Sequence, residues 1–359
     1  MGVTIQPTLF PRDPLAEVPR HPDARPDTST LLPLAEYDRI LVQFSGGKDS
    51  AALTLYLLDR LDAEGVSRSR VELWHQCVDG EPGSPTFMDW PVTHAYCVAF
   101  ARALDLPIRF QWREGGFWRE LMRDGTPTAP AVIELADGTR AERGGKGEPG
   151  TRLRFPQQSG DLSVRWCSAY LKIDVAARAI AADPRLAEGR FLVLTGERRE
   201  EGGEHGARAK YATTERHRTS NQRRRVDHHR PILGWSEARV WETLRAHGVV
   251  PHPVYYAGYG RCSCARCIFG GPDEWATARV LDPFNFERVA ALEQHFGVTI
   301  RRGQTVVEQA ARGGLLAPET ELSRWADVLS ATVYWGPIFV DPSAWVLPAG
   351  AYRRTAGPT

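Results

Sequence analysis

Short apolar runs alternate with amphipathic segments along much of the chain. The apolar runs predict strands at 40–44, 71–75, 108–112 and 191–194. Segments with an apolar residue every three or four positions predict helices at 49–61, 88–104, 172–182 and 236–247. Strands that alternate with helices favour a parallel sheet with right-handed crossovers. We therefore expect an α/β protein with a doubly wound, mostly parallel sheet.

The same patterns suggest how the chain is divided. Residues 1–36 are rich in Pro, Asp and Arg and poor in apolar side chains, which predicts an N-terminal arm. Residues 37–235 hold the strand–helix alternation, interrupted at 113–163, where Gly and Pro are frequent and periodicity is lost. We interpret 113–163 as an insertion across the top of the sheet. Residues 236–359 are expected to form a mostly helical C-terminal region.

Composition narrows the class of protein. The 359 residues are 42% hydrophobic and 25% charged with a formal net charge of +1, values typical of a globular protein. No apolar run approaches the roughly 18 residues that span a bilayer, and no secretion signal is recognisable, so we expect a cytoplasmic protein. Six cysteines are too few for a disulfide scaffold. Cys77 and Cys97 are expected in the core.

A glycine-bearing loop separates the first predicted strand from the first predicted helix. Glycines let the backbone approach a phosphate closely, and the N–H groups at a helix start point toward an anion. The loop differs from the Walker pattern, and a plain tight turn would explain the glycines but not the lysine and aspartate. A second loop, Thr195-Gly196, ends a later strand and should open into the same crevice. The first loop consists of Ser45, Gly46, Gly47, Lys48, Asp49 and Ser50.

This loop resembles the signature of the PP-loop ATP pyrophosphatase superfamily, whose fold is adenine nucleotide alpha-hydrolase-like. Over residues 39–270 the chain resembles the phosphoadenosine phosphosulfate (PAPS) reductase family, through segments 165–173, 195–201 and 231–236. The resemblance implies cleavage of ATP between the α- and β-phosphates with Mg²⁺, for which Asp49 is a plausible ligand. It implies catalytic roles for Lys48 and Asp49. Nucleotide contacts are implied for Ser45, Gly46, Gly47, Lys48, Asp49, Ser50, Gly196 and Arg198.

Four cysteines are candidate metal ligands, and three of them are close in sequence. Four thiolates suit a [4Fe–4S] cluster or a tetrahedral zinc, and buried free thiols are the simplest alternative. Because cluster-bearing reductases of the family resemble this plan, we favour the cluster, with zinc second. The four are Cys167, Cys262, Cys264 and Cys267.

No cysteine follows Cys267, whereas reductases of the family carry a catalytic cysteine near the C-terminus. The chain therefore resembles more closely the thiolation enzymes of the DndC and SspD group, which act in DNA phosphorothioation. That resemblance implies DNA as substrate, a cysteine desulfurase as sulfur donor, other phosphorothioation proteins as partners, and a catalytic or cluster-ligand role for Cys262. The alternatives are a tRNA thiolation enzyme, a sulfonucleotide reductase-like protein and a non-catalytic ATP-binding scaffold.

A basic stretch lies between residues 205 and 230, where eight Lys/Arg face two acids. Arginine suits bidentate phosphate contacts, so this stretch predicts a nucleic-acid-binding surface. A solvated charged face is the alternative. The predicted nucleic-acid contacts are Arg208, Arg218, Arg223, Arg224 and Arg225.

Overall fold

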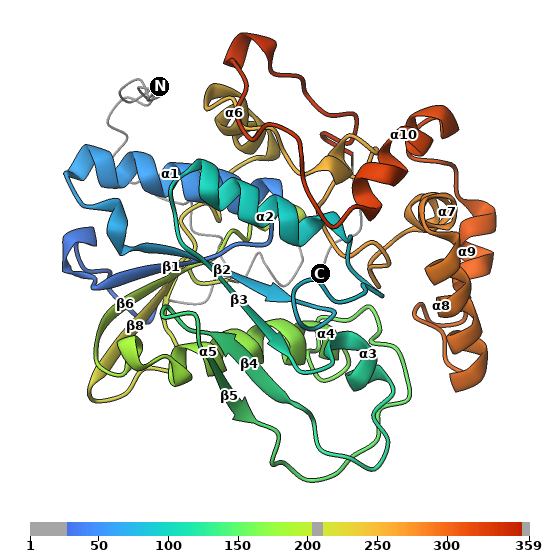
Figure 1. The fold of residues 1–359 in the computed structure, drawn as a ribbon, viewed down its shortest axis with the longest axis horizontal. Coiled ribbons are helices and arrows are strands. Elements are labelled where there is room, and N and C mark those ends of the chain that lie inside the picture. The colour runs from blue at the N-terminus through green and yellow to red at the C-terminus, as the bar shows by residue number, and fades with distance from the viewer. Residues whose placement is uncertain (1–26, 203–210, 354–359) are drawn as a thin grey trace.

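The computed structural model describes residues 27–202 and 211–353 (Figure 1). Within these ranges eight strands form one sheet in the order β5-β4-β3-β2-β1-β6-β8-β7. The pairs β3–β2, β2–β1, β1–β6 and β6–β8 are parallel, which confirms the predicted mostly parallel α/β sheet. The strands are β1 (Arg39–Gln43), β2 (Val71–Cys77), β3 (Ile108–Arg113), β4 (Pro130–Glu134), β5 (Arg140–Gly144), β6 (Gly189–Leu194), β7 (Thr214–Arg216) and β8 (Arg224–His229).

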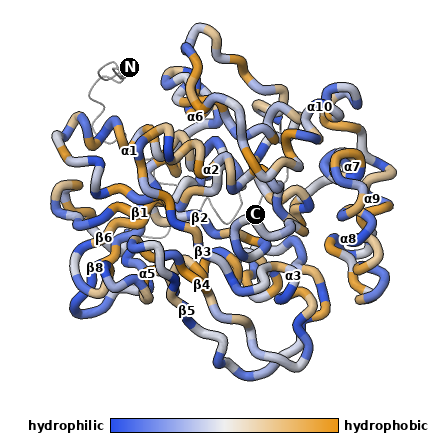
Figure 2. Tube along the Cα trace, in the orientation of Figure 1, coloured by the Kyte–Doolittle hydropathy of each residue, from blue (hydrophilic) through white to orange (hydrophobic). Residues whose placement is uncertain are grey.

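Helices cover both faces of the sheet. Helices α1 (Lys48–Glu64) and α2 (Val92–Ala103) lie on one face and α5 (Asp174–Ala182) on the other (Figure 1). Successive strand residues point to opposite faces. Accordingly Ile40 packs into the core beneath α1 and α2, and Leu41 packs into the core beside α5. The two strands at the centre of the sheet, β1 and β6, hold the uninterrupted apolar runs Ile-Leu-Val and Phe-Leu-Val-Leu, which burial on both faces requires and which are among the hydrophobic stretches of the tube in Figure 2.

The chain changes face between β1 and β6. Helix α1 follows β1 on one side, whereas α5 reaches β6 from the other side, and Val42 pairs with Leu194 where the two strands end. Such a switch point leaves a crevice at the carboxyl ends of the strands, where open α/β sheets bind their ligands.

The predicted insertion at 113–163 needs a correction. It holds the short helix α3 (Gly116–Leu121), but β4 and β5 extend the sheet as an antiparallel hairpin beside β3 instead of crossing its top. The reason is the alternation in β4, where Ala131 and Ile133 are buried on the α5 side of the sheet and continue its core. No hydrophobic pattern predicts strand β5, because its residues, Arg-Ala-Glu-Arg-Gly, carry almost no apolar surface.

The C-terminal region contributes to two apolar cores. Ser236 caps α6 (Glu237–Ala246), as predicted, by accepting a hydrogen bond from Arg239 N at 3.2 Å. One core joins α6 to α1 and α2, so this helix is not part of a separate body. A second core joins the insertion to the later helices. The remaining helices are α4 (Trp166–Ser168), α7 (Pro272–Leu281), α8 (Pro283–Phe296), α9 (Val306–Arg312) and α10 (Glu319–Ser330).

Two further expectations concern the first residues and the membrane. Residues 1–26 of the predicted arm lie outside the described ranges, while Leu31, Leu32 and Leu34 from its remainder pack against the first core. In the part of the chain that the structure describes, every helix is too short or too polar to cross a bilayer.

Candidate active site

A cleft of about 640 Å³ lies at the switch point, where β1 and β6 end. Its walls come from the loop after β1, the loop after β6, the β7–β8 hairpin and the loop of residues 256–271 before α7, which holds three cysteines and is called the cysteine loop below. The two glycine-bearing loops open into one cleft, as the sequence predicts. Residues that line it include Ser45, Gly47, Asp49, Ser50, Lys172, Thr195, Gly196, Glu197, Glu215, Arg218, His228, Arg230, Tyr255, Cys262 and Cys264.

The loop after β1, residues 45–50, is called the phosphate loop below. It is compact and needs its first glycine. Gly46 has φ +79°, and a Cβ there would lie 3.0 Å from Cys97 Sγ in the core beneath. Gly47 donates its N–H to Ser45 Oγ at 3.3 Å, and Ser50 Oγ donates to Gly47 O at 3.0 Å. Helix α1 begins at the next residue, so its positive N-terminal end and first-turn N–H groups lie at the cleft. This is a favourable place for a phosphate.

Lys48 is bound through its ammonium by other groups of the protein. Its side chain is buried and is not among the residues that line the cleft. Its Nζ donates to Gly260 O at 3.1 Å and lies 3.5 Å from Asp49 Oδ2 and 3.6 Å from Glu237 Oε1. Lys48 thus joins α1 to α6 and to the cysteine loop, and the ammonium that lines the cleft is that of Lys172. A phosphate-binding role for Lys48 stays a prediction.

Asp49 lines the cleft and is held by cations. Burial raises the pKa of its carboxyl, but Lys48 and Arg198 lower it further, so the net pKa lies below the ordinary value. The carboxylate is therefore ionised at neutral pH and has the hard oxygen donors that Mg²⁺ prefers. Arg198 is buried and donates from Nε to Asp49, so it positions this carboxylate from behind. Gly196 packs so closely that a Cβ there would lie 3.2 Å from the Asp49 carbonyl carbon.

Tyr255 joins the phosphate loop to the cysteine loop, a connection that sequence reasoning missed. Its buried hydroxyl accepts the N–H of Lys48 at 2.9 Å and the N–H of Cys262 at 3.1 Å. No motif marks this tyrosine, and only its position seven residues before Cys262 could have suggested a role.

The four candidate thiols do not share one environment. Cys167, Cys264 and Cys267 pack against the second core, whereas Cys262 packs against the first and touches the phosphate loop. A Cβ on Gly47 would lie 3.3 Å from the Cβ of Cys262. Burial raises the pKa of Cys167 to about 11 and that of Cys262 still higher, although Lys172 lowers both. As placed, these groups are thiols at neutral pH.

This placement does not fit the metal centre that the resemblance implies. Among the side chains in residues 27–202 and 211–353, no group of three or more His, Cys, Asp or Glu is arranged to hold a metal ion. A zinc site or a cubane cluster needs its thiolates to converge on one centre. We therefore derive no step through a cluster, and ligation by Cys167, Cys262, Cys264 and Cys267 stays a prediction of the sequence.

The structure separates the predicted nucleic-acid contacts. Arg224 is buried, and its guanidinium donates to the carbonyl oxygens of Thr219, Ile180 and Leu186 at 3.0 Å each. In this position the guanidinium joins β8 to the end of α5, to the segment before β6 and to the β7–β8 connection, and it is not available to a nucleic-acid phosphate. Arg225 is partly exposed and bound to a buried carboxylate of its own strand.

The other three arginines differ from one another. Arg223 is exposed and pairs with Glu188 at 3.0 Å on the surface. Arg218 lines the cleft, with its Nη2 3.3 Å from Ile173 O. Arg208 lies outside the described residues. Arg218 is therefore the predicted contact that the structure places at the candidate active site.

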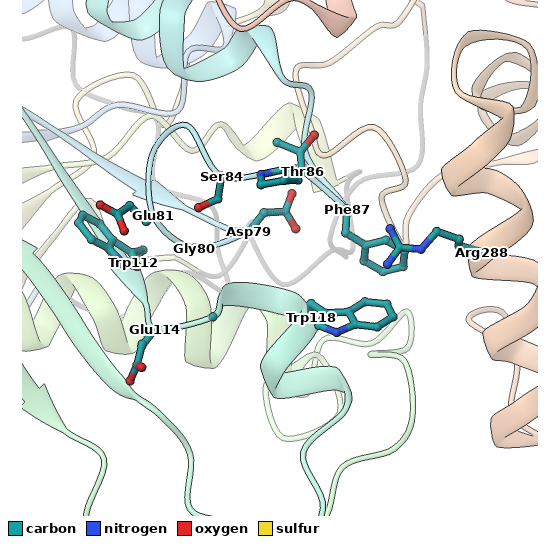
Figure 3. A pocket seen from close by; sticks show the side chains of 12 residues that line it. Asp79, Gly80, Glu81, Ser84, Thr86, Phe87, Trp112, Glu114, Trp118 and Arg288 are labelled. Carbon is teal, nitrogen blue, oxygen red and sulfur yellow. The ribbon is translucent and has the colours of Figure 1, made fainter.

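A second, smaller cleft of about 400 Å³ lies between the loop after β2 and helix α3 (Figure 3). Asp79, Glu81 and Glu114 contribute carboxylates to its wall. At its other end Arg288 of α8 lies over the rings of Phe87 and Trp118, 4.9 and 4.6 Å from their centroids. The larger cleft is lined by Lys172 and four arginines that offset its carboxylates, whereas Arg288 is the cation that the described residues contribute to the wall of the smaller one, so the polyphosphate of a nucleotide is expected in the larger cleft.

Part of the chain matches a known family. Residues 146–269 match the phosphoadenosine phosphosulfate reductase domain. The matched segment contains Cys167, Thr195 and the cysteines from 262 to 267, and the phosphate loop lies before it.

Other comparisons are more distant. An uncharacterised 37.8 kDa protein in the gpa 5′ region of Escherichia phage 186 is 29% identical over 152 residues, which cover 42% of this chain and 43% of that protein. The chain thus matches less than half of that relative's length.

Similar solved structures include Candida glabrata FMN adenylyltransferase with FMN and the ATP analogue AMPCPP, at 14% identity and a TM-score of 0.38, covering 88% of this chain and 82% of that one. The same enzyme with FAD and pyrophosphate gives 12% identity and a TM-score of 0.36, covering 67% of this chain and 58% of that one. Yeast FAD synthetase with FAD gives 10% identity and a TM-score of 0.33, with coverages of 90% and 82%. Scores this low add nothing to the fold read from the sheet itself.

Proposed function

We propose that this protein is an ATP pyrophosphatase that activates a backbone phosphate of DNA for sulfur insertion. The observation that carries the proposal is the contact between the two loops. The phosphate loop and two thiols line one cleft, and Gly47 and Cys262 lie side by side within it. A phosphate activated at the first loop would therefore be close to a sulfur atom at the second.

The cleft is suited to an ATP triphosphate. The α1 N-terminus offers N–H groups and a partial positive charge, and Lys172 adds a full one. Asp49 would hold Mg²⁺, which neutralises charge on the phosphates when it is bound. An acceptor oxygen attacks the α-phosphorus, the bond to the β-phosphate oxygen breaks, and pyrophosphate leaves with the electron pair.

Sulfur insertion follows from the adenylated acceptor. A phosphodiester oxygen is a poor leaving group, but once it is bonded to AMP it departs with the nucleotide. A cysteine desulfurase supplies the sulfur as a persulfide, whose terminal sulfur attacks the acceptor phosphorus while AMP carries the original oxygen away. A thiol reductant then attacks the inner sulfur of the persulfide, the S–S bond breaks with formation of a disulfide, and the phosphorothioate is released. Cys262 is the thiol best placed to carry that sulfur, because it contacts the phosphate loop.

The choice of DNA rests on the sequence resemblance to phosphorothioation enzymes. Arg216 and Arg218 in the cleft wall supply charge for an acceptor phosphate. These side chains suit any nucleic-acid backbone, so the identity of the acceptor is decided by experiment.

The first experiment identifies the products of ATP. Purified protein with Mg²⁺, ATP and duplex DNA is expected to release AMP and pyrophosphate. Asp49→Asn should abolish release without loss of folding. Asp59→Asn is the matched control, because Asp59 lies on the same helix and pairs with His247 at 3.1 Å away from the cleft. Release of ADP, or equal turnover by Asp49→Asn, would contradict the assigned site.

The second experiment identifies the acceptor. Mass spectrometry of nuclease digests compares DNA and tRNA from cells with and without the gene. Phosphorothioate-linked dinucleotides that disappear with the gene support the proposal. A thiolated tRNA nucleoside that disappears instead moves the activity to tRNA, and no change in either contradicts sulfur insertion.

A further inference from the structure

A carboxylate, an imidazole and a hydroxyl are hydrogen-bonded in series along one wall of the cleft. Glu215 Oε1 lies 2.9 Å from His228 Nδ1, and His228 Nε2 lies 2.7 Å from Thr195 Oγ1. An ionised carboxylate only accepts hydrogen bonds, so Nδ1 carries a proton and Nε2 faces the hydroxyl. Three strands supply the series, because Glu215 is on β7, His228 is on β8 and Thr195 directly follows β6.

The hydroxyl lies at the phosphate end of the cleft. Thr195 N donates to His229 O at 3.2 Å, which fixes the residue at the end of the sheet. The next residue, Gly196, packs against the backbone of Asp49 and Ser50 at the start of α1. Thr195 therefore stands beside the helix terminus at which the triphosphate is expected.

Two carboxylates beside the imidazole are held in their ionised form. The pKa of Glu215 is lowered to about 2, first by its hydrogen bond to His228 and also by Arg230. The pKa of Glu197 also lies below its ordinary value, because Arg230, His228 and a hydrogen bond from Thr195 outweigh burial. Two carboxylates thus face Arg230 and the imidazole. The titratable or charged groups around His228 are Glu215, His217, Glu197, His229 and Arg230.

The site also has unused hydrogen-bonding capacity. Glu197 Oε2 and Arg230 Nε are both buried without a hydrogen-bond partner among the described residues, and they lie 3.7 Å apart. Both residues line the cleft. A buried polar atom without a partner in a cleft wall is available to a bound ligand, ion or water molecule.

We propose that Thr195, His228 and Glu215 form a proton relay that assists the departure of pyrophosphate. As the bond from the α-phosphorus breaks, the electron pair goes to the pyrophosphate oxygen. The Thr195 hydroxyl turns from Glu197 toward that oxygen, gives it its proton and receives the Nε2 proton of His228. His228 is reprotonated from solvent. Thr195 is the catalytic residue, and His228 and Glu215 are positioning residues that act through it.

The relay rests on the proposed ATP cleavage, so its test measures both. The kcat and KM for ATP and the pH profile of pyrophosphate release are compared among Thr195→Val, Thr195→Ser, His228→Gln and the wild type. Because general acid catalysis contributes about 100-fold or more, kcat should fall by about that factor in the valine and glutamine variants, with KM unchanged. The pH profile of the wild type should differ from those of both slow variants, because the proton passes through the imidazole and the hydroxyl only where both are present.

Matched variants separate the relay from a structural effect. Thr195→Ser keeps the hydroxyl and should retain most of the activity. His247→Gln removes an imidazole that is paired with a carboxylate outside the cleft and should behave as wild type.

The possible failures are distinguishable. Normal kcat in Thr195→Val, a loss confined to KM, or a serine variant as slow as valine overturns the relay while ATP cleavage stands. A wild type that binds ATP and releases no pyrophosphate overturns both.

Discussion

The Tyr255 hydroxyl should contribute more to the free energy of unfolding than an ordinary tyrosine hydroxyl does, and Tyr255→Phe tests this. The change keeps the ring, which lies 5.2 Å from that of Trp241, and removes only the oxygen. Two backbone N–H groups, those of Lys48 and Cys262, then lose their acceptor. A buried donor left without a partner costs about 1–3 kcal/mol. Two donors with some relaxation should lower the free energy of unfolding by about 3 kcal/mol.

Urea unfolding measures this loss, and Tyr259→Phe is the control. Tyr259 lies in the same segment and is similarly buried, but its hydroxyl makes one long hydrogen bond of 3.4 Å to Glu274 O. Its removal should cost less than about 1 kcal/mol. Calorimetric titration with ATP adds a second readout, because Tyr255→Phe removes the acceptor that fixes the start of α1 beside the cleft and should weaken ATP binding.

The reasoning on Tyr255 is refuted if its phenylalanine variant unfolds within about 1 kcal/mol of the Tyr259→Phe control. That result would mean that water or a backbone shift satisfies both donors. Normal stability with weak ATP binding would locate the effect in the nucleotide complex alone, and would contradict the assigned magnitude.

Three further changes test other features. Gly46→Ala should lower ATP affinity by at least about ten-fold in a titration, because the residue has φ +79° and the new Cβ would lie 3.0 Å from a sulfur atom. Gly83→Ala is the control, because Gly83 has φ +84° but open space around it, and this variant should bind ATP normally. Burial, together with Asp79, raises the pKa of Asp89 to about 6, so the wild type loses stability relative to Asp89→Asn as pH rises from about 4 to 7, by at most about 3 kcal/mol in urea unfolding. A difference independent of pH would contradict this. Arg224→Ala should cost about 2–4 kcal/mol of unfolding free energy because it leaves three carbonyl oxygens without a donor, whereas Arg223→Ala should cost under about 1 kcal/mol; equal losses would contradict the assigned burial.

Local sequence patterns were sufficient for β1, β2, β3 and β6 and for the loops after β1 and β6, but not for β4, β5, β7 and β8. The run at 40–44 and the glycines after it predicted β1, the start of α1 and their cleft, because strand, turn and helix are all encoded within neighbouring residues. Thr195-Gly196 was placed correctly for the same reason. The β4–β5 hairpin was not predicted, because β5 is stabilised by its pairing with β4 and no local pattern of apolar residues indicates that pairing.

Side-chain directions were the harder part of the site. Lys48 belongs to the phosphate loop in sequence. Its ammonium, however, is bound by Gly260 O and by the carboxylates of Glu237 and Asp49. The basic stretch suggested one surface, yet strand alternation directs Arg224 inward and leaves Arg223 exposed. The series from Glu215 through His228 to Thr195 joins three strands, so only the folded sheet brings these residues together.

The β4–β5 hairpin has a consequence for how copies of this protein meet one another. The sheet ends at β5, whose residues are mostly exposed and charged, so this border resists pairing with the border of a second molecule. The opposite border, β7, is only three residues long, and Thr28 donates to Thr214 O along it. Without the hairpin, the border would be β3, whose last four residues are all buried in the intact protein. The hairpin thus covers the backbone hydrogen-bonding groups of β3. Removal of the hairpin should expose this strand and promote association of two molecules through the edges of their sheets.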